Sequence, residues 1–146
     1  MAEGLPMWLG GVQIPSGTGF VAHSDGDVAI HALCDALLGA AAMGDIGLHF
    51  PDNSPLWKGV DSKDLLRRVV GLIAENGWKP GNVDITIALQ TPKLRPFIDT
   101  MRSTLAPILG IDEDAVSVKA TTTEHLGFVG RGEGCEAWAV VTICKD

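Results

Sequence analysis

Residues 23–47 read HSDGDVAIHALCDALLGAAAMGDIG, and this stretch decides the fold class. Its middle part is rich in alanine and leucine, which favour helix. The apolar residues at helical spacing are Ile30, Leu33, Leu37 and Leu38. The pattern predicts a helix from Asp27 to Met43, stopped by Gly44. Because an amphipathic helix must bury its apolar side, we expect it to pack on a sheet.

The remaining segments add further helices and short β-branched runs. The expected strands cover residues 7–14, 83–89, 115–122 and 137–143, and the other expected helices cover residues 61–76 and 96–109. No linker or internal repeat divides the chain. We therefore expect one α+β domain over residues 1–146, with a mixed sheet of about four strands and about three helices packed on one face.

Composition excludes several classes of function. Acidic residues outnumber basic ones by 18 to 11, giving a net charge of −7, so no basic patch predicts nucleic-acid binding. Cys34, Cys135 and Cys144 are too scattered for a disulfide framework. No apolar run reaches the length of about 18 residues that a membrane span needs. We expect a cytoplasmic bacterial protein, with the plastid stroma as the less favoured location.

A polar stripe lies on the first predicted helix. Asp27, His31 and Asp35 are four residues apart and share one side, which we expect to face water or a ligand. The simpler alternative is that Asp25 or Asp27 caps the helix and His31 is an ordinary histidine. A helical histidine can bind zinc while a neighbour holds its other ring nitrogen, but one histidine alone makes no site.

Two further segments could contact phosphate. Thr121-Thr122-Thr123-Glu124 follows a strand and offers hydroxyls and a carboxylate for phosphate oxygens and a divalent ion. A turn with Glu124 as a capping partner is an equal alternative. Gln90-Thr91-Pro92-Lys93 resembles the rim of an anion pocket, although a solvated lysine is the commoner case.

The glycine-rich segment from Gly127 to Gly134 is not a dinucleotide-binding motif, because it leads into a strand and not into a helix. A hairpin-like connection with an exposed pair of Arg131 and Glu133 is the plainer interpretation.

Together these motifs resemble the 2-C-methyl-D-erythritol 2,4-cyclodiphosphate synthase family. The residues that carry the resemblance are His23 to His31, Gly44 to Gly47, Phe50 to Asp52, Lys119 to Glu124 and Gly130 to Gly134. The resemblance implies a homotrimer with active sites between subunits, in the non-mevalonate route to isoprenoid precursors. It also implies a lyase that cyclises 4-diphosphocytidyl-2-C-methyl-D-erythritol 2-phosphate and releases CMP.

The resemblance further implies roles for single residues. His31 resembles a zinc ligand, and Glu124 resembles the ligand of a magnesium or manganese ion. The implied catalytic residues are Glu124, Thr122, Thr123 and Asp45. The implied substrate contacts are His23, Ser24, Asp45, Ile46, Gly47, Phe50, Asp52, Pro92, Lys93 and Leu94. Phe128, Arg131 and Glu133 resemble the lining of a central cavity that holds an isoprenoid diphosphate in some members.

One departure from the family pattern concerns zinc. Family members carry an Asp-x-His motif with two zinc ligands, and none precedes Leu9-Gly10-Gly11-Val12 here. We expect weak zinc binding, unless His49 replaces a lost ligand. A catalytically impaired trimer of the same fold is therefore the alternative function. A trimeric enzyme of chorismate-mutase type is disfavoured, because the few arginines lie apart from the clustered aspartates.

Overall fold

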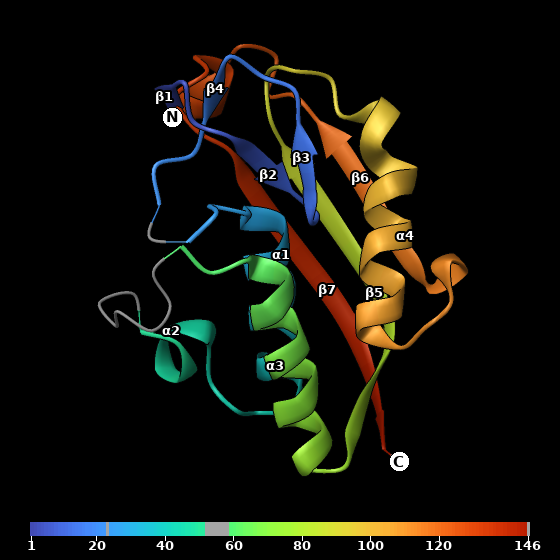
Figure 1. Ribbon diagram of the computed structural model, residues 1–146. Coiled ribbons are helices and arrows are strands. Elements are labelled where there is room, and N and C mark those ends of the chain that lie inside the picture. Colours follow the sequence, from blue (N-terminus) through green and yellow to red (C-terminus); the bar gives the residue numbers. More distant parts are fainter. Residues whose placement is uncertain (23, 52–58, 146) are drawn as a thin grey trace.

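The computed structural model describes residues 1–22, 24–51 and 59–145 (Figure 1). The strands are β1 (Ala2–Glu3), β2 (Met7–Leu9), β3 (Val12–Ile14), β4 (Thr18–Gly19), β5 (Trp78–Ala88), β6 (Val116–Thr121) and β7 (Glu136–Lys145). The α-helices are α1 (Val28–Ala40), α2 (Ile46–His49), α3 (Ser62–Glu75), α4 (Ile98–Leu109) and α5 (Gly127–Gly130). Short 3-10 helices η2 (Arg95–Phe97) and η3 (Glu113–Ala115) flank α4.

The main sheet has β5 at its centre. β6 pairs with β5 in parallel, with Val83 opposite Val116, and β7 pairs with β5 antiparallel, with Val83 opposite Val141. The sheet is mixed, as predicted, but the described residues place three strands in it and not four. The difference lies in residues 7–14, which form two short strands outside this sheet.

Residues 7–14 fold as a hairpin because two glycines form its turn. β2 pairs with β3 antiparallel, with Leu9 opposite Val12. Gly10 and Gly11 adopt φ values of 61° and 77°, and positive φ at both central residues is what a tight two-residue hairpin requires. A Cβ on Gly10 would also lie 2.7 Å from the Met101 side chain. A strand prediction based on alternation alone overlooked this turn.

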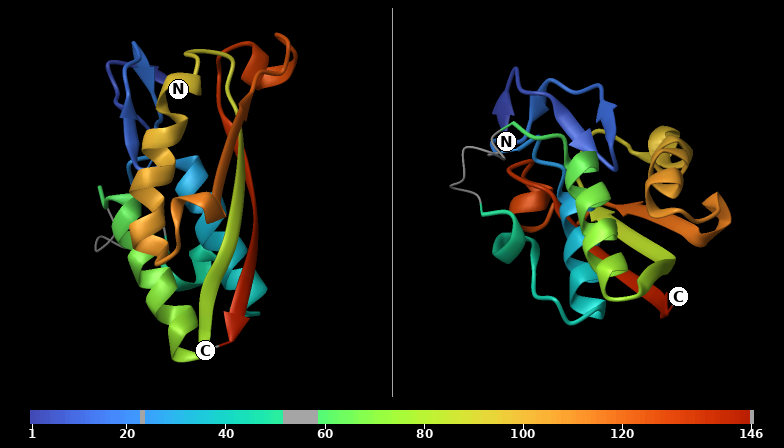
Figure 2. Two further views of the ribbon diagram at one scale, coloured as in Figure 1. Left: turned by 90° about the vertical axis from the view of Figure 1, so that its right-hand side faces the viewer. Right: turned by 60° about the horizontal axis from the view of Figure 1, so that its bottom comes forward.

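The helices cover one face of the main sheet. Ile85, Ile87 and Val118 point to the buried face, whereas Trp138 and Val140 on β7 are 54% and 72% exposed. The left view of Figure 2 shows α3 and α4 on one side of β5 and β7. The prediction of helices on a single face is confirmed, and within the described residues no element covers the opposite face. None of the described helices has the length and apolar character needed to cross a membrane.

Asp27 joins the hairpin to α1. Its side chain is fully buried, and its Oδ1 accepts hydrogen bonds from the backbone N–H of Gly10 and of Ile30, both at 3.0 Å. Its Oδ2 accepts a third from Gly11 N at 2.7 Å. Burial raises the pKa of the Asp27 carboxyl, and these backbone donors oppose that rise. One carboxylate thus caps the helix and holds the turn.

Asp27→Ala is expected to lower the free energy of unfolding by roughly 3 kcal/mol or more, since two buried donors and one partly buried donor lose their acceptor and each costs about 1 to 3 kcal/mol. Urea denaturation measures this change. Asp99→Ala is the matched control, because Asp99 is 92% exposed on α4 and an exposed pair contributes at most about 1 kcal/mol. Equal losses in the two variants would contradict a structural role for Asp27.

Candidate active site

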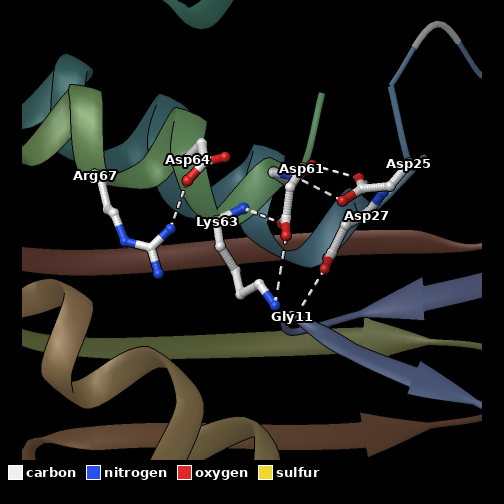
Figure 3. Close-up of polar contacts among 8 residues, drawn as sticks. Gly11, Asp25, Asp27, Asp61, Lys63, Asp64 and Arg67 are labelled. Carbon is white, nitrogen blue, oxygen red and sulfur yellow. Dashed lines mark hydrogen bonds and ion pairs between the residues drawn. The ribbon is translucent and has the colours of Figure 1, made fainter. Parts of the chain in front are cut away.

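Two helix starts and one loop meet beside the hairpin turn (Figure 3). α3 begins after Asp61, whose carboxylate caps it by accepting from Lys63 N at 2.9 Å. Asp25, just before α1, reaches across to α3: its Oδ2 accepts from Ser62 N at 2.8 Å and its Oδ1 from Ser62 Oγ at 2.5 Å. The N-termini of α1 and α3 are thereby fixed relative to each other.

The predicted polar stripe is only partly formed. Asp27 does not face water or a ligand, because it is the buried N-cap of α1. The simpler alternative, a capping aspartate, is therefore correct for Asp27. Asp35 is exposed and accepts a hydrogen bond from Ile46 N at 2.7 Å. Of the three residues, His31 alone remains beside a cavity.

His31 lies in α1 between two hydroxyl groups. Its Nε2 is 3.1 Å from Ser62 Oγ and 3.4 Å from Ser24 Oγ. Ser24 and His31 line a cavity of about 420 Å³ together with Phe20, Gly134 and Cys135. The structure thus brings Ser24 and His31 together. His23, the third member of this predicted group, lies outside the described residues.

The segment that follows α1 is held by its own polar groups. Asp45 caps α2 by accepting from Leu48 N at 2.9 Å. His49 Nε2 donates to the Met43 carbonyl at 2.8 Å, so this ring nitrogen is engaged within the segment. Gly47 is exposed, Ile46 is half-buried and Phe50 is buried. Asp52 lies outside the described residues.

A second cavity of about 420 Å³ opens between the 89–95 loop and β6. Its lining includes Pro92, Lys93 and Leu94, the predicted pocket rim, together with Lys119 from β6 and Thr122 from the segment predicted to contact phosphate. The Thr91–Pro92 peptide bond is cis. Two segments that are distant in sequence therefore form one pocket with two lysines, which is suited to an anionic ligand.

The hydroxyls beyond β6 differ in their hydrogen bonds. Thr123 Oγ donates to the Leu126 carbonyl at 2.6 Å. Thr122 Oγ accepts from Glu124 N at 3.3 Å, and its own proton has no acceptor among the described residues. Glu124 is exposed with φ of 53°. The capping alternative for Glu124 is wrong, because α5 begins after Leu126 and has no side-chain cap.

The glycine-rich segment contains α5 and does not form a hairpin connection. β6 and β7 lie on opposite sides of β5, so the segment crosses the end of the sheet. Arg131 and Glu133 form the expected exposed pair, with Nε and Oε1 2.8 Å apart, and this contact lowers the pKa of the Glu133 carboxyl. Phe128 is 42% exposed, and its ring is the group that a Cβ on Gly134 would strike, at 2.9 Å.

The described residues of one chain offer no donor set that fits a zinc ion. Among residues 1–22, 24–51 and 59–145, no three His, Cys, Asp or Glu side chains form a group that could hold a metal. The Nε2 of His31 faces hydroxyl groups instead. Zinc at His31 would need ligands from outside these residues.

Sequence reasoning missed some residues beside the site. Ser62 lay within a predicted helix and had no role assigned, although its hydroxyl contacts His31. Lys119 belonged to a matching motif without a role, yet it lines the pocket of Lys93 and forms an ion pair with Asp84 at 2.8 Å. This contact with Lys119 lowers the pKa of Asp84. Lys119 lies on β6, the strand that pairs with β5. A prediction of this strand pairing could have placed Lys119 at the pocket.

Comparisons with known proteins identify the family of the chain. The model of the YgbB family matches residues 1–144. A 2-C-methyl-D-erythritol 2,4-cyclodiphosphate synthase of Pseudomonas aeruginosa is 61% identical over 97% of this chain and 90% of its own length. One from Thioalkalivibrio sulfidiphilus is 63% identical over 92% of this chain and 84% of its own.

Solved structures show the same fold. The bifunctional IspDF of Campylobacter jejuni superposes with a TM-score of 0.95 and 44% identity, and the match covers 99% of this chain but 39% of that one. The IspF of Plasmodium falciparum in complex with CDP gives a TM-score of 0.85 and 34% identity, over 99% of this chain and 87% of that one. With a family model that spans nearly the whole sequence, the chain belongs to the YgbB family.

Proposed function

We propose that this chain is a 2-C-methyl-D-erythritol 2,4-cyclodiphosphate synthase of isoprenoid precursor biosynthesis. The observation that carries the proposal is the 61% identity to a curated synthase over 97% of the chain. Its substrate is 4-diphosphocytidyl-2-C-methyl-D-erythritol 2-phosphate, and its products are the cyclic diphosphate and CMP. Identity at this level over nearly the full length does not favour an impaired trimer. The bacterial relatives support a cytoplasmic location.

The pocket with Lys93 supports a nucleotide site. Pro92 and Leu94 supply apolar surface for a base, while Lys93 and Lys119 place positive charge beside an anionic diphosphate. A relative binds CDP, which is the same kind of nucleotide. We assign the cytidine end of the substrate to this pocket and its methylerythritol end to Asp45, Ile46, Gly47, Phe50 and Asp52, with His23 and Ser24 as further contacts.

The reaction is an intramolecular transfer. An oxygen of the 2-phosphate attacks the β-phosphorus, a new P–O bond forms, and the bond to the CMP oxygen breaks, so CMP leaves with that electron pair. No external nucleophile takes part. The residues of this chain orient the two phosphates and offset negative charge, which is how positioning accelerates such a step. Thr122 fits this role because its hydroxyl proton is available to a phosphate oxygen.

Metal ions are part of the proposal. Zinc at His31 and magnesium or manganese at Glu124 would neutralise phosphate charge when bound. His31 is one ligand among several that zinc needs. Glu124 is exposed next to Thr122, where a phosphate-bound cation could reach it.

We further propose a homotrimer. Among the described residues, none lines both the His31 cavity and the Lys93 cavity, so these residues do not join the two cavities within one chain. The outer face of the sheet carries exposed Trp138 and Val140, and Asp84 Oδ1 on that face is buried without a hydrogen-bond partner in the described residues. A neighbouring copy would cover this face. Phe128, Arg131 and Glu133 would line a central cavity for an isoprenoid diphosphate.

The activity is tested by mass spectrometry of the purified chain with the cytidine diphosphate substrate. We expect CMP and the cyclic diphosphate in equal amounts with zinc and magnesium present, and neither product after a chelator removes both ions. CMP without the cyclic product would indicate hydrolysis and would contradict the proposed synthase. Undiminished turnover with a chelator would contradict the metal requirement alone.

Thr122→Val should lower kcat/KM by roughly 10- to 100-fold, because a hydrogen bond to a charged oxygen contributes about 1.5 to 3 kcal/mol. Thr123→Val is the matched control: its hydroxyl already donates to Leu126, so we expect a smaller loss of kcat/KM. Steady-state kinetics of the two variants make the comparison. The reverse order would show that Thr123 is the phosphate contact.

Trp138→Glu should break the trimer, because it places a charge in the apolar part of the uncovered sheet face. Light scattering after size exclusion gives the mass of the assembly. Thr100→Glu serves as control, since Thr100 is exposed on α4, on the helical side of the sheet. A monomeric wild-type chain, or a trimer that survives Trp138→Glu, would contradict an interface on this face.

A further inference from the structure

Asp25 and Ser62 form a hydrogen-bonded chain that ends at His31. The backbone N–H and the hydroxyl of Ser62 both meet the Asp25 carboxylate, at 2.8 and 2.5 Å. The same Ser62 Oγ lies 3.1 Å from His31 Nε2. Ser62 is fully buried, and Asp25 is half-buried. The three side chains come from the loop before α1, from α3 and from α1.

The direction of these hydrogen bonds follows from the number of protons. An ionised carboxylate only accepts, and a serine hydroxyl has one proton to donate. A hydrogen bond to a charged acceptor is roughly twice as strong as a neutral one. The proton of Ser62 therefore points to Asp25, and Ser62 Oγ turns a lone pair toward His31.

A lone pair 3.1 Å from His31 Nε2 is favourable only if that nitrogen carries a proton. Ser24 Oγ could donate to an unprotonated Nε2, but it is farther away, at 3.4 Å. That arrangement would also leave two lone pairs facing each other at the shorter contact. The nearer partner thus decides the position of the ring proton.

We propose that Asp25 and Ser62 are positioning residues that hold His31 as its Nε2–H tautomer. Nδ1 is then the ring nitrogen with a free lone pair, available to a substrate proton or a cation. A second partner that fixes both tautomer and ring orientation is a general requirement for a histidine that acts through one nitrogen. The contribution of Asp25 and Ser62 to catalysis rests on the proposed function. The tautomer of His31 does not depend on that function.

Nitrogen NMR of the full-length, chelator-treated chain tests the tautomer directly. At a pH of about 8, above the ordinary histidine value of about 6.5, we expect a protonated-type shift for His31 Nε2 and an unprotonated-type shift for Nδ1. His31→Gln identifies the signals. A ring that is protonated on Nδ1, or that averages between both forms, would overturn the proposal.

Two variants show whether Asp25 and Ser62 set the tautomer. Ser62→Ala should shift the ring toward a mixture of both forms and lower kcat/KM by roughly 10- to 100-fold, the usual effect of losing such a partner. Ser103→Ala is the matched control on α4, where the hydroxyl is exposed. Asp25→Asn should also weaken the preference for Nε2–H, because an amide group facing Ser62 Oγ would donate where the carboxylate accepted.

The outcomes separate the two proposals. An Nε2–H ring in a chain that makes no cyclic diphosphate would leave the positioning role of Asp25 and Ser62 on the ring intact and remove the proposed function. An active synthase whose Ser62→Ala variant keeps a pure Nε2–H ring would remove the positioning role and leave the function.

Discussion

The fold depends on one buried carboxylate. Asp27 collects the N–H groups of Gly10, Gly11 and Ile30, and these donors belong to the hairpin turn and to the first turn of α1. Each would otherwise be a buried polar group without a partner. Since α1 packs on β5 and β7, the position of the hairpin relative to the main sheet follows from this contact. Asp25, two residues earlier, links α3 to the start of α1, because its carboxylate accepts a hydrogen bond from Ser62 N.

Because all long helices pack on one face of the sheet, the described residues leave the other face uncovered. Its β7 residues Trp138 and Val140 are exposed. Large apolar side chains of this type stabilise a strand mainly by packing against neighbours. The charged pair of Lys119 on β6 and Asp84 on β5 lies on the same face. An apolar surface with an internal ion pair is better matched to a copy of the chain than to water. In the proposed trimer, neighbouring chains would also join the two cavities that the described residues of one chain keep separate.

Much of the fold could be predicted from the sequence, because the strongest signals are local. The helix predicted over residues 61–76 matches α3 to within one residue at each end, and β-branched runs located β5, β6 and β7. The hairpin at 7–14 was missed, although two adjacent glycines between short apolar runs are a turn signal, because the segment was taken as one strand. The order of strands in the sheet also depends on packing between distant segments, which periodicity does not contain.

The site was predictable at the level of residue types and less so at the level of roles. Motif spacing placed Lys93 and Thr122, and the structure joins them in one cavity. Motif spacing could not show that Asp27 is buried, since a carboxylate on an exposed side of the helix would have the same spacing. Burial depends on the hairpin, which lies 16 and 17 residues away along the chain.

Hydroxyl groups of the same residue type play different roles in this chain, because their hydrogen-bond partners differ. Thr122 and Thr123 are adjacent and alike, yet one hydroxyl gives its proton to the Leu126 carbonyl and the other keeps its proton available. Ser62 and Ser24 both face His31, but only Ser62 has its proton committed to a carboxylate. A side chain with one proton can donate once, so its partner on the other side decides whether it gives or accepts at the site. The acceptors that the fold places around each hydroxyl therefore decide whether that hydroxyl donates or accepts at the site.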